Sequence, residues 1–373
     1  MNIAVNTVSL FDSRPAGFEH SIFDRVSRLA LQFPQHQFIY IFSGHFDQKF
    51  ITSENIKALR VKPSLLWQYW YTIKLPVALK KINADILLNM TGICSSNTKI
   101  PQCIWVPENA LVQESFFTSK KLIRFYKRHL SRFMMQACTI LTPSEYVKSA
   151  LIEKLKIAET KINVILPAIN KNFRIIDEPG KEKVKQEYTG GKEYFLFSGA
   201  LHPANNLMNL LKAFSVFKKR QKSNMQLLIA GEPGAGHDIL LKSLQTFKYR
   251  DDVKLTSQLK EQALARVFAA AYAFVYPTMS GEFVMHPLEA MHCGVPVITS
   301  NKGSLSERCG NAAMYCDPAS FTDIAEKMMD LFKDENKKKE MVEKGFEQVK
   351  RFNPEQAAEQ LWQSLLKCTG PVN

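Results

Sequence analysis

Short apolar runs alternate along the chain with longer stretches in which apolar residues recur every three or four positions. The short runs are typical of buried β-strands, and the longer pattern indicates amphipathic helices. We expect strands at 3–10, 38–42, 84–89, 103–106, 139–141, 194–198, 225–230, 253–255, 274–276 and 295–299. We expect helices at 22–33, 120–135, 206–219, 261–271, 322–331, 335–349 and 354–366, and another that begins at Ser144.

This alternation of strand and helix predicts parallel sheets with right-handed crossover connections. Ligands bind such sheets beyond the carboxyl ends of the strands. A polar stretch at 172–192 contains Pro179-Gly180 and Gly190-Gly191. We interpret this stretch as a linker between two α/β halves, because such residues mark turns and loops.

At 373 residues, the chain is long enough for two domains. Its hydrophobic share of 46% and its charged share of 23% are those of a soluble globular protein. No run approaches the roughly 18 apolar residues of a membrane span, and the N-terminus lacks the features of a signal peptide. Seven scattered cysteines without a CxxC pair favour reduced thiols in a cytoplasmic protein over a disulfide framework or a zinc site.

The net charge is +14 at pH 7, and part of it is concentrated in the predicted helix from Lys120 to Arg132. No acidic residue occurs between Glu114 and Glu145, and a basic stripe runs beside an apolar one. One interpretation is a helix packed on the sheet with a solvated basic face. The other is contact with anionic lipid headgroups, peripheral at the inner face of the cell membrane, or with a pyrophosphate-linked acceptor. Nucleic acid is disfavoured because no aromatic and basic platform or known motif is present.

The stretch 274–300 is the most informative part of the sequence, and it predicts a strand, a polar loop, a short helix and a second strand. Pro287 suits the first turn of a helix, since its missing N–H would be unpaired there. A loop that enters a helix beside parallel strands favours an anion, because free backbone N–H groups and the positive end of the helix dipole point outward. Glu289 lies two residues into this helix, where it is placed to accept hydrogen bonds from the hydroxyls of a phosphate-bearing ligand.

This stretch resembles the donor-site signature of the family 4 retaining glycosyltransferases, enzymes with the two-domain GT-B fold. The signature is a Glu, seven residues, and a second Glu that opens Glu-Ala-Met-Ala-Cys-Gly-x-Pro-Val-Ile. The residues that match the second part in register are Glu289, Ala290, Met291, Cys293, Gly294, Pro296, Val297 and Ile298. A second segment resembles the Gly-x-Leu-x-Pro-Arg-Lys-Asn-Leu motif of the family through Gly199, Leu201, Pro203, Asn206 and Leu207.

The resemblance covers nearly the whole chain and implies two Rossmann-like parallel-sheet domains that face a central cleft. We place an N-terminal acceptor-binding domain at 1–175 and a nucleotide-sugar-binding domain at 190–351. A C-terminal helix at 352–373 is expected to cross back to the first domain, as it does in the family.

The resemblance also implies roles for individual residues. Glu289 would hold the donor ribose, Glu282 would orient the sugar, and Glu108 would supply a second carboxylate at the catalytic centre. The remaining donor-binding candidates, which would surround the diphosphate, are Gly17, Gly199, Asn205, Asn206, Val284, Met285 and His286. No metal and no cofactor is implied beyond a UDP- or GDP-linked sugar that serves as substrate.

The chain departs from the family pattern at three places. Pro107 stands where many members have a histidine that faces the transferred sugar, and proline can neither donate a hydrogen bond nor take a proton. Ala204 and Asn205 replace the Arg-Lys pair that neutralises the donor diphosphate. The order Gly281-Glu282 replaces the usual Glu-Gly. A leaving diphosphate needs positive charge, so an active enzyme would need Lys302 or another basic group there.

Two functions therefore stay open. The first is a retaining glycosyltransferase that moves a hexose, with mannose among the candidates, from a nucleotide-sugar to a glycan or lipid-linked acceptor in surface polysaccharide biosynthesis. The second is a catalytically inactive relative that binds glycan or partners an active transferase. Basic charge near the diphosphate distinguishes the two, because only the active enzyme needs it.

Overall fold

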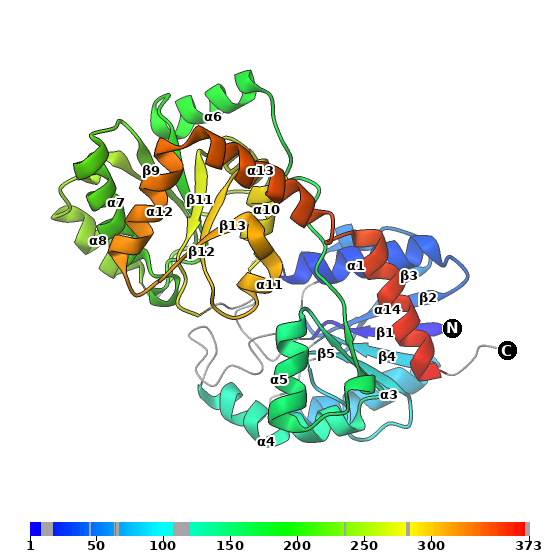
Figure 1. Cartoon of the computed structure of the whole chain (residues 1–373). Coiled ribbons are helices and arrows are strands. Elements are labelled where there is room, and N and C mark those ends of the chain that lie inside the picture. Colours follow the sequence, from blue (N-terminus) through cyan, green and yellow to red (C-terminus); the bar gives the residue numbers. More distant parts are fainter. Residues whose placement is uncertain are drawn as a thin grey trace. The chain divides into compact units, whose positions relative to one another are not determined.

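The structure is a computed structural model that describes residues 1–8, 18–44, 46–62, 64, 67–90, 92–106, 120–234, 236–280 and 284–369. The chain divides into two compact units. Unit 1 comprises Met1–Ala168 and Asn353–Asn373, and unit 2 comprises Ile169–Phe352. Each unit is built around one parallel β-sheet with helices packed against it (Figure 1).

Seven described strands form the sheet of unit 1 in the order β3-β2-β1-β4-β5-β6-β7, and all neighbours are parallel. Their bounds are β1 Asn2–Asn6, β2 Gln37–Phe42, β3 Ile56–Arg60, β4 Ile86–Asn89, β5 Gln102–Trp105, β6 Thr139–Thr142 and β7 Ile162–Val164. The strand order reverses between β1 and β4, which is the topological switch point of such a sheet.

Helices cover both faces of this sheet because successive strand residues point to opposite sides. Ile3 and Val5 pack in a core with α1 (Phe18–Gln32) and α14 (Pro354–Thr369). Ala4 packs in the other core, whose helices are α3 (Leu75–Lys81), α4 (Lys120–Gln136) and α5 (Glu145–Leu155). Ahead of α3 lie α2 (Trp67–Tyr69) and a π-helical segment at Trp70–Lys74.

Six described strands form the sheet of unit 2 in the order β10-β9-β8-β11-β12-β13, again all parallel. Their bounds are β8 Tyr194–Ser198, β9 Gln226–Ala230, β10 Val253–Thr256, β11 Ala273–Tyr276, β12 Val297–Ser300 and β13 Ala313–Cys316. The helices are α6 Glu178–Thr189, α7 Leu207–Gln221, α8 His237–Gln245, α9 Glu261–Ala269, α10 His286–His292, α11 Leu305–Cys309, α12 Phe321–Lys333 and α13 Glu335–Val349. Here the order reverses between β8 and β11.

The predicted linker at 172–192 was wrong, because most of it forms helix α6. Asp177 caps its first turn by accepting a hydrogen bond from Gly180 N at 3.0 Å, and Pro179 occupies the first turn, where proline is tolerated. Gly190 ends the helix with φ +62°, a conformation that suits glycine. The proline and glycines that suggested a loop are therefore the start and stop signals of a helix, and unit 2 begins earlier, at Ile169.

The predicted parallel sheets are confirmed, and besides α6 the sequence analysis missed several shorter elements among those described. Strand β3 lies at the sheet edge and is mostly exposed, so it lacks the apolar run of a buried strand. Strand β13 and helices α8 and α11 were also not predicted. Within the described ranges, no helix is both long and apolar enough to cross a membrane.

Candidate functional site

The segments that follow β8 and β11 meet at the switch point of unit 2. These two strands are hydrogen-bonded neighbours, and both end at the same edge of the sheet. Residues 199–206 follow β8, and residues 277–280 follow β11 and lead toward α10. Sheets of this order bind their ligands at this edge, so both segments that resemble the glycosyltransferase motifs lie at the expected place.

The loop after β8 depends on a close approach of two glycines. Gly199 has φ +147°, a conformation that side chains rarely adopt, and its N–H donates to Ala230 O at 3.1 Å. A Cβ on Gly231 would lie 2.0 Å from Gly199 O. Leu201 N also donates to Glu232 O at 2.9 Å. The loops after β8 and β9 are thus packed backbone to backbone.

Asn205 fixes this loop to β11 with both ends of its buried amide group. Its Nδ2 donates to Ala200 O at 2.8 Å, and its Oδ1 accepts from Tyr276 Oη at 2.8 Å. The side chain is only 2% exposed. The Asn205 amide therefore has both of its hydrogen-bond partners inside the fold. In the family resemblance, this position is that of a basic residue.

Asn206 links three loops at the same edge. It has φ +61°, and its Nδ2 donates to Pro277 O at 2.9 Å and to Pro318 O at 2.6 Å. The buried hydroxyl of Thr278 adds a further contact by donating to Ala204 O at 3.1 Å. Asn206 thus shapes the edge of the sheet at which the family resemblance predicts donor binding. Direct contact between Asn206 and the donor stays a prediction.

Glu289 and His286 form a pair on α10. His286 Nδ1 lies 2.7 Å from Glu289 Oε2, and the two side chains are 21% and 10% exposed. This contact is a hydrogen bond for a neutral imidazole and an ion pair for a protonated one. Oε1 accepts no hydrogen bond from the part of the chain that the structure describes, so it can accept one from a ligand hydroxyl. The histidine therefore orients the carboxylate that the sequence singled out.

Arg308 is a basic residue at this site that sequence reasoning missed. It lies on α11, is 1% exposed, and donates from Nη1 to Val284 O at 3.3 Å. Gln348 Nε2 donates to the Arg308 carbonyl oxygen at 2.5 Å and so helps to hold the end of α11. The family resemblance also includes the neighbouring Glu307 and Gly310, so an arginine between two positions that match the family pattern was the available signal.

Three of the predicted site residues, Gly17, Glu108 and Glu282, lie outside the described residues. Val284 and Met285 are half-buried ahead of α10, and Met285 occupies its N-cap position without a side-chain cap. Lys302, the predicted substitute for the missing basic pair, is exposed. Within the described part of unit 2, the structure thus brings Gly199, Asn205, Asn206 and the α10 pair to one edge of the sheet.

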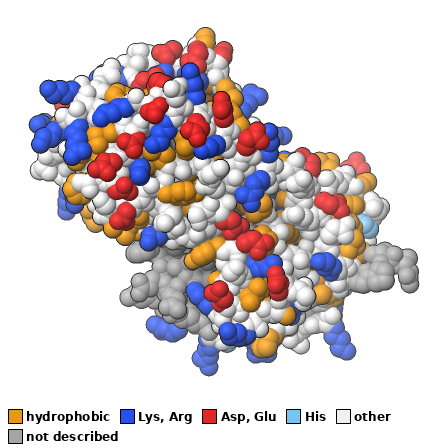
Figure 2. All heavy atoms as spheres, in the orientation of Figure 1, with side chains coloured by type: hydrophobic (Ala, Val, Ile, Leu, Met, Phe, Trp, Pro, Cys, Tyr) orange, Lys and Arg blue, Asp and Glu red, His pale blue; other side chains and the backbone are white. Residues whose placement is uncertain are grey.

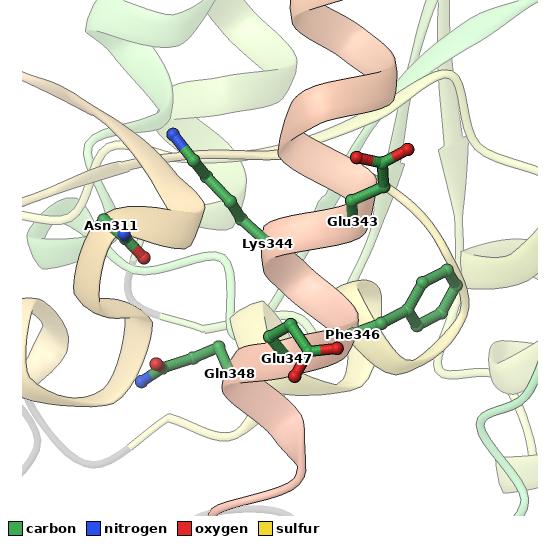
Figure 3. Close-up of a pocket in the computed structure, with 6 residues that line it drawn as sticks. All are labelled: Asn311, Glu343, Lys344, Phe346, Glu347 and Gln348. Atoms are coloured by element: carbon green, nitrogen blue, oxygen red, sulfur yellow. The ribbon is translucent and has the colours of Figure 1, made fainter.

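A hollow elsewhere in unit 2 lies apart from this edge. It is lined by residues of α13 and by one residue of the turn before β13 (Figure 3): Glu343, Lys344, Phe346, Glu347, Gln348 and Asn311. Asn311 precedes β13 and therefore lies at the amino end of that strand. Because ligands of parallel sheets bind at the carboxyl ends, this hollow is a poor candidate for the donor site.

The basic helix of unit 1 is confirmed as amphipathic over its described side chains. Arg124, Arg128 and Arg132 are exposed, whereas Phe133 and Met134 are buried. The side chain of Lys121 lies outside the described part. In the space-filling view, Lys and Arg side chains project along the lower margin, where Figure 1 shows α4 and α3 (Figure 2).

Comparisons with known proteins agree with this arrangement. Residues 180–348 match the family described as glycosyl transferases group 1. The chain is 26% identical over 242 residues to O-antigen chain mannosyltransferase B of Escherichia coli, which covers 65% of this chain and 64% of that protein. It is 27% identical over 277 residues to O-antigen chain mannosyltransferase RfbU of Salmonella typhimurium, which covers 72% of this chain and 70% of that protein.

Solved structures show the same fold at low sequence identity. A glycosyltransferase from Rickettsia africae superposes with a TM-score of 0.79 at 16% identity, covering 100% of this chain and 99% of that one. Anabaena Alr3699/HepE in complex with UDP-glucose superposes with a TM-score of 0.76 at 16% identity, covering 98% and 99%. The chain therefore has the GT-B fold, and the comparisons support a group 1 glycosyltransferase.

Proposed function

We propose that the chain is a retaining hexosyltransferase that moves a hexose from a nucleoside-diphosphate sugar to a glycan or lipid-linked acceptor in surface polysaccharide biosynthesis. The observation that carries the proposal is the Glu289 carboxylate, held by His286 at the carboxyl edge of the unit 2 sheet. It occupies the position of the second glutamate in the donor signature. Mannose is the first sugar to test, because the two curated relatives described above are named mannosyltransferases.

The proposed donor roles follow from chemistry at this edge. Glu289 accepts hydrogen bonds from the ribose hydroxyls through the oxygen that His286 leaves open. The backbone N–H groups at 284–286 bind the diphosphate, which is favoured ahead of α10 by the helix dipole. Glu282 orients the sugar. The glycosidic C1–O bond to phosphate breaks as the acceptor oxygen bonds to C1 from the same face, and the departing phosphate oxygen takes the acceptor proton without a metal ion.

The second candidate, a non-catalytic relative, rests on the loss of the Arg-Lys pair. Arg308 favours the active enzyme, because it brings a guanidinium to the carbonyl of Val284 in the proposed diphosphate loop. A buried charge acts more strongly than an exposed one, since less water screens it.

The test of the proposed function combines binding and turnover. The purified full chain is titrated calorimetrically with UDP, GDP, UDP-glucose and GDP-mannose. The preferred donor is then incubated with candidate acceptors, and the anomeric configuration of the product is determined by NMR. A product with the anomeric configuration of the donor supports the proposal. Inversion contradicts the retaining mechanism, and saturable binding without any transfer or hydrolysis supports the non-catalytic relative.

Arg308→Lys is expected to weaken binding of the preferred nucleotide about tenfold. Lysine keeps the positive charge but cannot reproduce the guanidinium geometry toward Val284 O, and a hydrogen bond from a charged group contributes about 1.5 kcal/mol or more. Calorimetry measures the affinity, and circular dichroism checks the fold. The matched control is Arg220→Lys, the same exchange at an exposed arginine of α7. Equal affinity of both variants and the unchanged chain would remove Arg308 from the site.

We further propose that the exposed basic face of α4 contacts an anionic membrane surface on which a lipid-linked acceptor is presented. Arg124, Arg128 and Arg132 lie on that face, and Met135 beside them is 67% exposed. Basic residues near an anionic surface contribute about 1 kcal/mol each.

Replacing the three arginines of this face by glutamine is therefore expected to weaken binding to phosphatidylglycerol vesicles at least about tenfold. The control replaces Lys219, Arg220 and Lys339, three exposed basic residues of unit 2, by glutamine and removes the same net charge. Vesicle sedimentation measures the membrane binding of both triple variants. Equal loss in the two variants would show that only the total charge matters, and no loss in the first would exclude α4 as the contact.

A further inference from the structure

Three cysteines that are far apart in the sequence meet in unit 1. Cys103 lies on β5, Cys138 directly precedes β6, and Cys368 lies in the last turn of α14. Cys103 is paired across the sheet with Thr139, and Cys368 Sγ lies 3.2 Å from Thr139 Oγ1. Cys138 directly precedes Thr139 and Cys103 is its partner on β5, so all three cysteines lie around this residue.

The three thiols differ in access to solvent and in ionisation. Cys138 is exposed, Cys368 is half-buried and Cys103 is fully buried. Hydrogen bonds from Cys103, and then from Cys138 and Thr139, lower the pKa of Cys368 to about 6 against the effect of burial. Desolvation raises the pKa of Cys138 to about 11. Cys368 is thus the thiol of this cluster that ionises most readily, and the solvent-exposed Cys138 lies beside it.

We propose that Cys368 and Cys138 form a peroxide-sensitive dithiol that closes reversibly to a disulfide. The Cys368 thiolate attacks one oxygen of hydrogen peroxide, which gives a sulfenic acid and, after protonation, water. The Cys138 sulfur then attacks the Cys368 sulfur, the S–O bond breaks, and the hydroxyl leaves as a second water. Two thiols lose two electrons and two protons in total, and peroxide is the oxidant. Thiols of other proteins or small molecules reverse the reaction by exchange.

The other cysteines lack these properties. Burial raises the pKa of Cys94, Cys309 and Cys316 to about 12 in each case, and it raises the pKa of Cys293 as well. All four are buried, so oxidation there is disfavoured. Among the described residues, no group of three or more His, Cys, Asp or Glu side chains is arranged to hold a metal ion. The cluster therefore favours thiol–disulfide chemistry over metal binding.

The disulfide would have a structural consequence within unit 1. It would join the segment before β6 to the end of α14, whose other turns bury Leu361, Trp362 and Leu365 in the core. Oxidation would fix this helix covalently to the sheet. We therefore expect the oxidised chain to unfold at a higher temperature than the reduced chain.

The test uses the full chain, reduced and freed of reductant, then treated with equimolar hydrogen peroxide at pH 7. Free thiols are alkylated, and peptides are mapped without reduction. The expected product is one linked peptide pair that joins Cys138 to Cys368 and that dithiothreitol separates. The rate of oxidation is expected to fall as the pH is lowered through about 6, since the thiolate is the nucleophile. A Cys103–Cys368 link, or no link, overturns the proposal.

Single-cysteine variants separate the role of Cys368, which reacts with peroxide, from that of Cys138, which closes the disulfide. In Cys138→Ser, Cys368 is expected to stop at the sulfenic acid, which dimedone labels and mass spectrometry locates. In Cys368→Ser, oxidation of Cys138 is expected to be at least about tenfold slower, because its thiolate is scarce. Cys309→Ser serves as the control and should retain the linked pair. Equal oxidation of Cys138 with and without Cys368 contradicts the proposed order. The unchanged chain supplies the decisive peptide map even where a variant folds poorly.

Discussion

Glu289→Gln is expected to weaken binding of the nucleotide donor at least about a hundredfold. The carboxylate can accept hydrogen bonds from two ribose hydroxyls, and bonds to a charged acceptor contribute about 1.5–3 kcal/mol each. Glutamine offers one acceptor oxygen and no charge, so a loss of about 3 kcal/mol, or two factors of ten, is expected. Calorimetric titration with the preferred nucleotide measures the change.

The substitution is suited to this test because glutamine has the size of glutamate and can still hydrogen-bond His286 Nδ1. Its matched control is Glu326→Gln, an exposed glutamate on α12. We expect the control to bind like the unchanged chain and both variants to melt at similar temperatures. If Glu289→Gln binds nucleotide as tightly as Glu326→Gln does, then Glu289 does not hold the ribose.

Gly231→Ala is expected to destabilise unit 2 by about 2–3 kcal/mol and to remove donor binding. The added Cβ would lie 2.0 Å from the carbonyl oxygen of Gly199, a backbone atom that cannot rotate away. Forcing additional atoms into packed structure typically costs about 1–3 kcal/mol, and a clash with backbone lies at the upper end. The loop after β8 has to move, and with it the edge at which the donor is proposed to bind. Thermal and urea unfolding measure the stability.

Gly44→Ala provides the control for the same chemical change. A Cβ on Gly44 would meet no atom within 4 Å, and this glycine has no positive φ. The free energy of unfolding of Gly44→Ala is expected to stay within about 0.5 kcal/mol of that of the unchanged chain, as is usual for surface substitutions. A Gly231→Ala variant that is as stable as Gly44→Ala would contradict the close approach of the two loops.

Much of the fold could be predicted because buried parallel strands are short, apolar and separated by amphipathic helices. The predicted strand at 194–198 and the predicted helix at 335–349 match β8 and α13 residue for residue. The largest error has a physical cause, since one residue type serves two purposes. Proline and glycine in 178–190 begin and end a helix, although the same residues also form loops.

The candidate site could be located from the sequence but not worked out atom by atom. The spacing of the motifs placed Glu289 and Gly199 at one edge of a sheet. It could not show that the Asn205 amide is bonded to Tyr276, because that contact joins residues 71 positions apart in the sequence. Arg308 was missed for the same reason, since its link to Val284 spans 24 residues.

The discontinuity of unit 1 affects the order in which the chain can fold during synthesis. Residues 169–352 emerge from the ribosome as one continuous segment and contain every described strand of their own sheet. Unit 1 emerges first, yet the part of its sheet that α14 covers stays exposed until Leu361, Trp362 and Leu365 have been made. The half that is translated first is therefore completed last, and part of its apolar surface is exposed to aggregation for as long as the rest is being translated.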